Sequence, residues 1–105
     1  MDIKNVGIKD ALGNPAKVPD QDNIAVELML FDALRTILWT MPSTDLTLGD
    51  SIIARVVIQG MNTASQNGNV WKAEEAHYEW LKEKVRLHAT KVFGINAICV
   101  VEELD

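Results

Sequence analysis

The longest regularly patterned stretch of the chain reads AEEAHYEWLKEKVRLHATKVF over residues 73–93 and is followed by Gly94. At about 100° per residue, its apolar side chains form one narrow stripe of Tyr78, Leu81, Val85, Ala89 and Val92. Gly94 stands where a helix commonly ends, because glycine takes the left-handed conformation without a steric cost. The pattern predicts a helix over 73–93 around which the rest of the chain is organised.

A second apolar group lies on roughly the opposite side of this predicted helix. Its members are Ala76, Trp80 and Leu87. One interpretation is that the helix lies between two layers of its own domain. The other is that Trp80 and Leu87 contact a partner or a second copy, because tryptophan is enriched at the centres of protein interfaces. The pattern leaves both interpretations open.

Length and composition are those of an ordinary small globular protein. The 105 residues fit one domain with a modest core. The formal net charge is −5 and the basic residues are dispersed, which argues against a nucleic-acid partner. A single cysteine, Cys99, leaves no internal disulfide and fits a reducing compartment. We expect a cytoplasmic protein, and we expect no secretory leader because Met1 leads into polar sequence.

Residues 24–41 predict a second helix, which ends at Pro42. Asp20, Asp22 or Asn23 would cap its first turn. Three charges within this apolar run argue against a membrane span. A broad apolar stripe is expected to form the core of the fold, and it comprises Leu30, Phe31, Ala33, Leu34, Ile37, Leu38 and Met41.

Arg35 and Trp39 lie four residues apart on the more polar side of the helix predicted over 24–41. This spacing would allow a cation–π contact between them, worth about 0.5–1 kcal/mol. Trp39 could cover an edge of the core or take part in an interface. Together the two residues form a possible second contact patch.

Residues 48–61 predict a third helix, because Thr47 followed by Asp50 resembles a capping box. In this helix Ile52, Ile53, Val56, Val57 and Gly60 would follow helical spacing. A strand over 51–59 is the alternative, since the segment is rich in β-branched residues and flanked by glycines. Residues 62–69 are expected to form a polar loop.

The two ends of the chain complete the expected organisation. Residues 1–23 predict an irregular arm, with a turn at Gly13-Asn14-Pro15. Residues 97–104 predict a short helix capped by Asn96, with a strand over 95–101 as the alternative. The expected fold over residues 1–105 is therefore a single, mainly all-α domain. It would be a small bundle of three to four helices with an irregular N-terminal arm, and an α+β fold is the alternative.

The sequence contains no recognisable catalytic, cofactor-binding or metal-binding motif. His77 and His88 are eleven residues apart on one helix, about 16 Å along its axis, too far to share one metal ion. No glycine-rich phosphate loop occurs. The glutamates from Glu74 to Glu83 are interleaved with basic residues, as on a solvated face. We therefore expect a protein that is not an enzyme and has no cofactor.

Three short motifs resemble small phage- and prophage-encoded proteins of uncharacterised role. They are Ile8-Lys9-Asp10-Ala11-Leu12-Gly13-Asn14-Pro15, Leu46-Thr47-Leu48-Gly49-Asp50 and Glu79-Trp80-Leu81-Lys82-Glu83-Lys84. The motifs occur in order along most of the chain, which departs from the usual pattern by the added helix over 24–41. The resemblance implies a viral context and supplies neither an activity nor site residues.

These observations favour a non-catalytic phage-type accessory protein that acts through protein–protein contacts, as a homo-oligomer or with a viral or host protein. The residues expected at the interface are Trp80, Leu87 and Ala76, with Trp39 and Arg35 as the second patch. The alternative is a small-ligand binding or sequestering protein with a pocket between helices or subunits.

Overall fold

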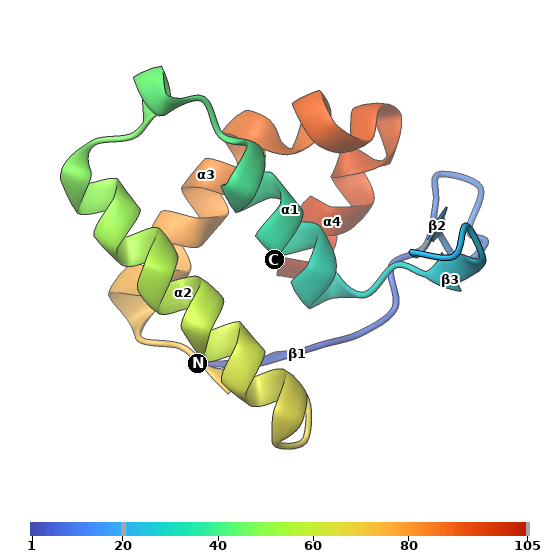
Figure 1. Cartoon of the computed structure of the whole chain (residues 1–105), viewed down its shortest axis with the longest axis horizontal. Helices are drawn as coiled ribbons and strands as arrows, with labels where there is room; N and C mark the ends of the chain where they lie inside the picture. Colours follow the sequence, from blue (N-terminus) through green and yellow to red (C-terminus); the bar gives the residue numbers. More distant parts are fainter. Residues whose placement is uncertain (20, 105) are drawn as a thin grey trace.

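The computed structural model describes residues 1–19 and 21–104, and it is mainly helical with a small strand component (Figure 1). Its α-helices are α1 (Leu30–Thr40), α2 (Leu48–Gln66), α3 (Glu75–Phe93) and α4 (Ala97–Leu104). Short 3₁₀ turns over Ser43–Asp45 and Gly94–Asn96 precede α2 and α4. The strands form two antiparallel pairs, β1 (Asp2–Lys4) with β4 (Val70–Lys72) and β2 (Lys17–Pro19) with β3 (Ala25–Glu27). The mainly helical character predicted from the sequence is confirmed.

The core lies where α1 packs against α3 and α4. Every member of the apolar stripe predicted for α1 is buried. On α3 the predicted stripe from Tyr78 to Ala89 is also buried, while Val92 is half-buried. Each large apolar side chain buried here contributes about 1.5–3 kcal/mol to folding. The Tyr78 hydroxyl donates a hydrogen bond to the Leu104 carbonyl, which ties α4 to α3.

The helix predicted over 24–41 is wrong at its start, because α1 begins only at Leu30. Residues Ala25–Glu27 form strand β3 instead, and Val26 pairs with Val18 of β2. Asn23, between the two strands, has a φ of 58°, a left-handed conformation that asparagine tolerates better than most residues. Asp22 and Asn23 therefore belong to a hairpin and do not cap α1, and Asp20 lies outside the described residues.

The free backbone N–H groups in the first turn of α1 find their hydrogen-bond acceptors in the N-terminal segment of the chain. Its N-cap residue, Met29, makes no side-chain cap. The Asn5 side-chain oxygen accepts from the Phe31 N–H at 2.9 Å, and the Val6 carbonyl accepts from the Leu30 N–H at 2.8 Å. These free N–H groups need acceptors at every helix start. An asparagine distant in sequence thus replaces the local cap that the sequence suggested.

Helix α2 begins as predicted, with a capping box at Thr47 and Asp50. The Asp50 N–H donates to Thr47 Oγ1 at 3.0 Å, and the Thr47 N–H donates to Asp50 Oδ2 at 3.1 Å. The strand alternative over 51–59 is wrong. The helix runs on to Gln66, so most of the loop expected over 62–69 is helical. The helix ends at Gln66, and Gly68 and Asn69, in the turn that follows, both have positive φ.

The predicted irregular arm over 1–23 holds two strands, β1 and β2. Strand β1 pairs with β4, and buried Ile3 lies opposite buried Trp71. The N-terminal amine of Met1 donates to the Ala73 carbonyl at 3.0 Å. This pairing places the start of the chain beside the connection between α2 and α3 (Figure 1). Helix α3 begins at Glu75, two residues later than predicted, because the Ala73 backbone extends the β4 pairing through hydrogen bonds with Met1.

Residues Ala97–Leu104 form helix α4, so the strand alternative over 95–101 is wrong. Helix α3 ends at Phe93, and Gly94 follows with a φ of 57°. Its ψ of −131° lies outside the left-handed helical region expected from the sequence, in a conformation that glycine adopts far more readily than other residues.

Candidate interaction surface on helix α2

Trp80, the first residue expected at an interface, packs against α2 of its own chain. Its side chain is half-buried, and its indole Nε1–H donates to Asp50 Oδ1 at 3.0 Å. Asp50 is also the capping residue in the first turn of α2. Trp80 therefore fastens the start of α2 to α3, which corresponds to the intramolecular interpretation of its position.

The electrostatics of this contact favour the ionised form of Asp50. Hydrogen bonds from the Trp80 indole and from the Thr47 backbone lower the pKa of the Asp50 carboxyl below its ordinary value of 3.8, against the opposing effect of burial. The Lys84 ammonium, 3.7 Å from Asp50 Oδ2, adds a favourable charge. The Asp50 carboxylate thus contacts groups of its own chain, and the Asp50 side chain is only 18% exposed.

Leu87 and Ala76, on the same side of α3 as Trp80, are both exposed. The surface of α3 around Leu87 is densely charged. One hollow of about 590 Å³ beside it is lined by Glu79, Trp80, Lys82, Glu83, Arg86 and Leu87. A second hollow, of about 310 Å³, is lined by Asp45, Lys84, Leu87, His88 and Lys91. Leu87 and the half-buried Trp80 are therefore the apolar side chains of the first hollow, and the others lining it are ionic.

Arg35 and Trp39 do not act together in this structure. The Arg35 guanidinium binds the Asp32 carboxylate and the Asn62 side-chain oxygen, so it joins α1 to α2 and does not stack on Trp39 as predicted. A cation–π contact is formed elsewhere, with Lys82 Nζ 5.1 Å from the centre of the Tyr78 ring. Trp39 is 76% exposed at the C-terminal end of α1.

Helix α2 carries an apolar ridge that faces solvent. This α2 ridge consists of Leu48, Ile52 and Val56, which are 80%, 59% and 43% exposed. Residues four apart lie above one another on a helix surface, so the three form a continuous row. The core is contacted by the other side of α2, through Val57, Met61 and Ala64. The helix thus has two apolar faces, and one of them has no contact with its own core.

An apolar cleft runs beside the ridge. This α1–α2 cleft has a volume of about 400 Å³, and it is lined by Leu38, Trp39, Met41, Leu46, Ser51, Ala54, Arg55, Ile58 and Gln59. Three of these residues, Ser51, Arg55 and Gln59, follow the three ridge residues at a spacing of three. Positions i and i+3 are neighbours on a helix. The ridge therefore runs along one rim of the cleft, and Trp39 lies on the α1 side.

The outer face of α2 is almost free of charge. The helix contains two charged residues, Asp50 and Arg55, in 19 positions. Asp50 is bound to Trp80 and Lys84, so Arg55 is the charge that lies at the cleft. Aromatic residues and arginine are enriched at protein interfaces, and the other charged residues are depleted there. Trp39, Arg55 and the uncharged ridge match this composition.

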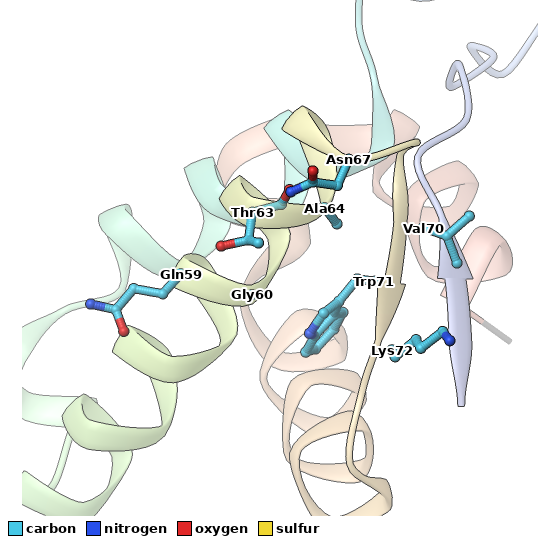
Figure 2. Close-up of a pocket in the computed structure, with 8 residues that line it drawn as sticks. All are labelled: Gln59, Gly60, Thr63, Ala64, Asn67, Val70, Trp71 and Lys72. Carbon is cyan, nitrogen blue, oxygen red and sulfur yellow. The ribbon is translucent and has the colours of Figure 1, made fainter.

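The second half of α2 is held by another tryptophan, Trp71 of β4. Figure 2 shows the Trp71 indole pointing from the strand toward α2 at Gly60, with Gln59, Thr63 and Asn67 along the helix. A Cβ atom on Gly60 would lie 2.5 Å from Trp71 Nε1, so only glycine permits this approach. Trp80 therefore contacts α2 in its first turn and Trp71 contacts it at Gly60, so the two tryptophans hold the helix at two points along its length.

The α2 ridge was missed by sequence reasoning, which noted the helical spacing of Ile52, Ile53, Val56, Val57 and Gly60 without separating two faces. The signal was present in the doublets Ile52-Ile53 and Val56-Val57. Adjacent residues on a helix point about 100° apart, so both members of a doublet cannot fit one narrow stripe. Two consecutive doublets at a spacing of four indicate two apolar faces.

The histidines of α3 lie in separate environments. His77 Nε2 is 3.9 Å from a Glu74 carboxylate oxygen. His88 is buried, with Nε2 4.0 Å from Asp45 Oδ2, and its Nδ1 has no hydrogen-bond partner in the described part of the chain. Among residues 1–19 and 21–104, no group of three or more His, Cys, Asp or Glu residues could hold a metal ion. The expectation of a non-catalytic protein stays a prediction.

Comparisons with protein-family models, curated proteins and solved structures find no match to this chain. The viral context suggested by the three sequence motifs therefore stays a prediction. In the described residues, no helix has both the length and the apolar character needed to cross a membrane.

Proposed function

We propose that this protein is a non-catalytic accessory protein, a small bundle of helices whose α2 outer face binds another protein. The observation that carries the proposal is the coincidence of an exposed apolar ridge with an adjoining apolar cleft on a helix face with little charge. Large contiguous exposed apolar patches on soluble proteins commonly mark sites of interaction. A phage-type role in the cytoplasm, in assembly or in restraint of a host protein, remains part of the proposal.

The proposal can be tested in the cells that express the protein. A photo-crosslinking amino acid is placed at position 52 in one variant and at position 87 in another. These positions are a matched pair, because Ile52 and Leu87 are 59% and 58% exposed on different helices. We expect a defined crosslinked protein from position 52 and little from position 87. Equal crosslinking from both positions, or none from position 52, would contradict the proposal.

A second candidate function is the binding of a small apolar ligand in the α1–α2 cleft. It is supported by the cleft volume of about 400 Å³, within the range of small-molecule sites, and by the single cation of Arg55 among apolar side chains. A ligand that binds only the folded protein must raise its unfolding temperature. Thermal unfolding with amphipathic carboxylates, compared between the natural protein and an Ala54→Phe variant that fills the cleft, tests this function.

A further inference from the structure

We propose that the partner of the α2 face is a second copy of this chain. The α2 ridge of each copy would enter the α1–α2 cleft of the other about a two-fold axis. This inference rests on the proposed function and names its partner. It follows from three properties of the face: its shape, its charge and its size.

The shape of the face is complementary to itself. A two-fold interface uses the same patch on both copies, so that patch must offer both a projection and a depression. The α2 ridge supplies the projection and the α1–α2 cleft supplies the depression. The two lie side by side, because the α2 residues that line the cleft run parallel to the ridge. Ridges of side chains on one helix commonly pack into grooves between the residues of another. In a dimer with two-fold symmetry, the ridge of each copy would therefore fill the cleft of the other copy.

Charge selects this face over the other exposed surfaces for self-association. Each chain carries a formal net charge of −5, so two copies repel one another in general. The outer face of α2 presents no free carboxylate, because Asp50 is bound to Trp80 and Lys84. Arg55 is compatible with an interface, since its guanidinium is weakly hydrated and stacks on aromatic rings. The outer face of α3, by contrast, carries glutamates together with lysines and an arginine, and a second copy there would have to desolvate these ionic groups.

The size of the face suits a weak, concentration-dependent dimer. The ridge and the α2 residues of the cleft lie between Leu48 and Gln59, a length of about 18 Å along the helix. The cleft and Trp39 extend the face across to α1, to a width of about 20 Å, which is one interhelical distance plus one helix diameter. A face of these dimensions covers less than the roughly 800 Å² per partner of typical specific interfaces, which places it among the weaker contacts. Trp39 would become a buried anchor of the kind that dominates binding energy.

The test is the oligomeric state of the full chain in solution, by sedimentation equilibrium from micromolar to millimolar concentration. We expect the average mass of the natural protein to rise toward twice the monomer mass as the concentration approaches millimolar. Ile52→Glu places a carboxylate in both halves of the interface and should weaken dimerisation by about a hundredfold or more. Leu87→Glu, the matched control on α3, should leave the dimer unchanged. Circular dichroism checks that both variants are folded.

A mixing experiment distinguishes the ridge-and-cleft arrangement from a general apolar contact. Ile52→Glu damages the ridge and Ala54→Phe fills the cleft, so each variant alone loses both contacts of its dimer. A mixed dimer keeps one intact ridge in one intact cleft. We expect the mixture to associate more strongly than either variant alone. Association of the mixture that is no stronger than that of either variant would overturn the proposed arrangement.

Other outcomes separate this inference from the proposed function. A natural protein that stays monomeric up to millimolar concentration overturns the second copy as partner. If position 52 then crosslinks to a different protein in cells, the proposed function stands and the partner of the α2 face is that protein. If position 52 crosslinks to nothing, both are overturned. A dimer that Leu87→Glu disrupts and Ile52→Glu leaves intact would move the interface to α3.

Discussion

Helices α2 and α3 have the same length, 19 residues, and use their apolar residues in opposite ways. Helix α3 turns its large apolar side chains inward and carries seven charged residues. Helix α2 buries fewer large side chains, carries two charged residues and leaves an apolar ridge in solvent. In our proposal, therefore, the absence of charge on α2, more than the presence of a tryptophan on α3, marks the helix face that binds a partner.

The largest effect is expected on the free energy of unfolding, when one leucine on α3 is compared with one leucine on α2. Leu81 of α3 is fully buried and Leu48 of α2 is 80% exposed. Leu81→Ala should lower the free energy of unfolding by about 2–5 kcal/mol, because it removes packed atoms and leaves a cavity. Leu48→Ala should change it by no more than about 0.5 kcal/mol in the monomer. Urea denaturation at low protein concentration measures both, and a comparable loss from Leu48→Ala would place the ridge in the core.

A smaller effect tests how α2 is held by Trp71. Gly60→Ala should lower the free energy of unfolding by about 1–3 kcal/mol, because the new Cβ would lie 2.5 Å from the Trp71 indole. This loss should appear although alanine favours helix over glycine by about 1 kcal/mol. Gly49→Ala is the matched control on the same helix, since its nearest neighbour, Thr47 Oγ1, is 3.6 Å away. A Gly60→Ala protein as stable as Gly49→Ala would show that Trp71 does not require the close approach.

The smallest effect concerns the contact between Trp80 and Asp50, and it depends on pH. The folded protein lowers the pKa of the Asp50 carboxyl below 3.8, chiefly through the Trp80 hydrogen bond. The resulting stabilisation is present above pH 3.8 and is lost as the pH falls through the lower, folded-state pKa. Asp50→Asn and Trp80→Phe should each reduce the unfolding temperature at neutral pH. Their difference from the natural protein should shrink as the pH falls below 3.8.

Thermal unfolding followed by circular dichroism across this pH range measures the effect. A difference between Trp80→Phe and the natural protein that stays constant with pH would contradict the role of the indole hydrogen bond. In that case Trp80 would stabilise α2 through apolar packing alone.

Local chemistry made several features predictable. The capping box of α2 and the glycine after α3 were identified because they depend on neighbours within three residues. The buried stripe of α1 was predicted in full, since a wide periodic run of apolar residues has one stable use, in a core. The start of α1 was not predictable, because its N–H groups bind Asn5, which is distant in sequence.

In the candidate site, too, local features were predictable and contacts between distant residues were not. The sequence indicated two apolar sides on α3 and proposed Trp80 and Leu87 for an interface. The contact between Trp80 and Asp50 spans 30 residues, and no periodicity specifies it. Trp39 was named as a possible contact residue, but the cleft beside it forms only when α1, Leu46 and α2 come together. The ridge itself was visible in the doublets of α2, but the helical spacing noted for residues 52–60 did not separate the two faces.

The sequence by itself indicated the helices in outline, where α2 begins and where α3 ends, and that α1 and α3 supply core residues, but it misplaced the start of α1 and the end of α2. These properties follow from periodicity and capping, which act over one or two helical turns. Only the tertiary structure decided which of the two apolar faces of α2 is buried. That choice depends on Trp71 and Trp80, because each packs against α2 from another element and turns Val57 and Met61 inward. The ridge is left outside because the core has room for one face of the helix.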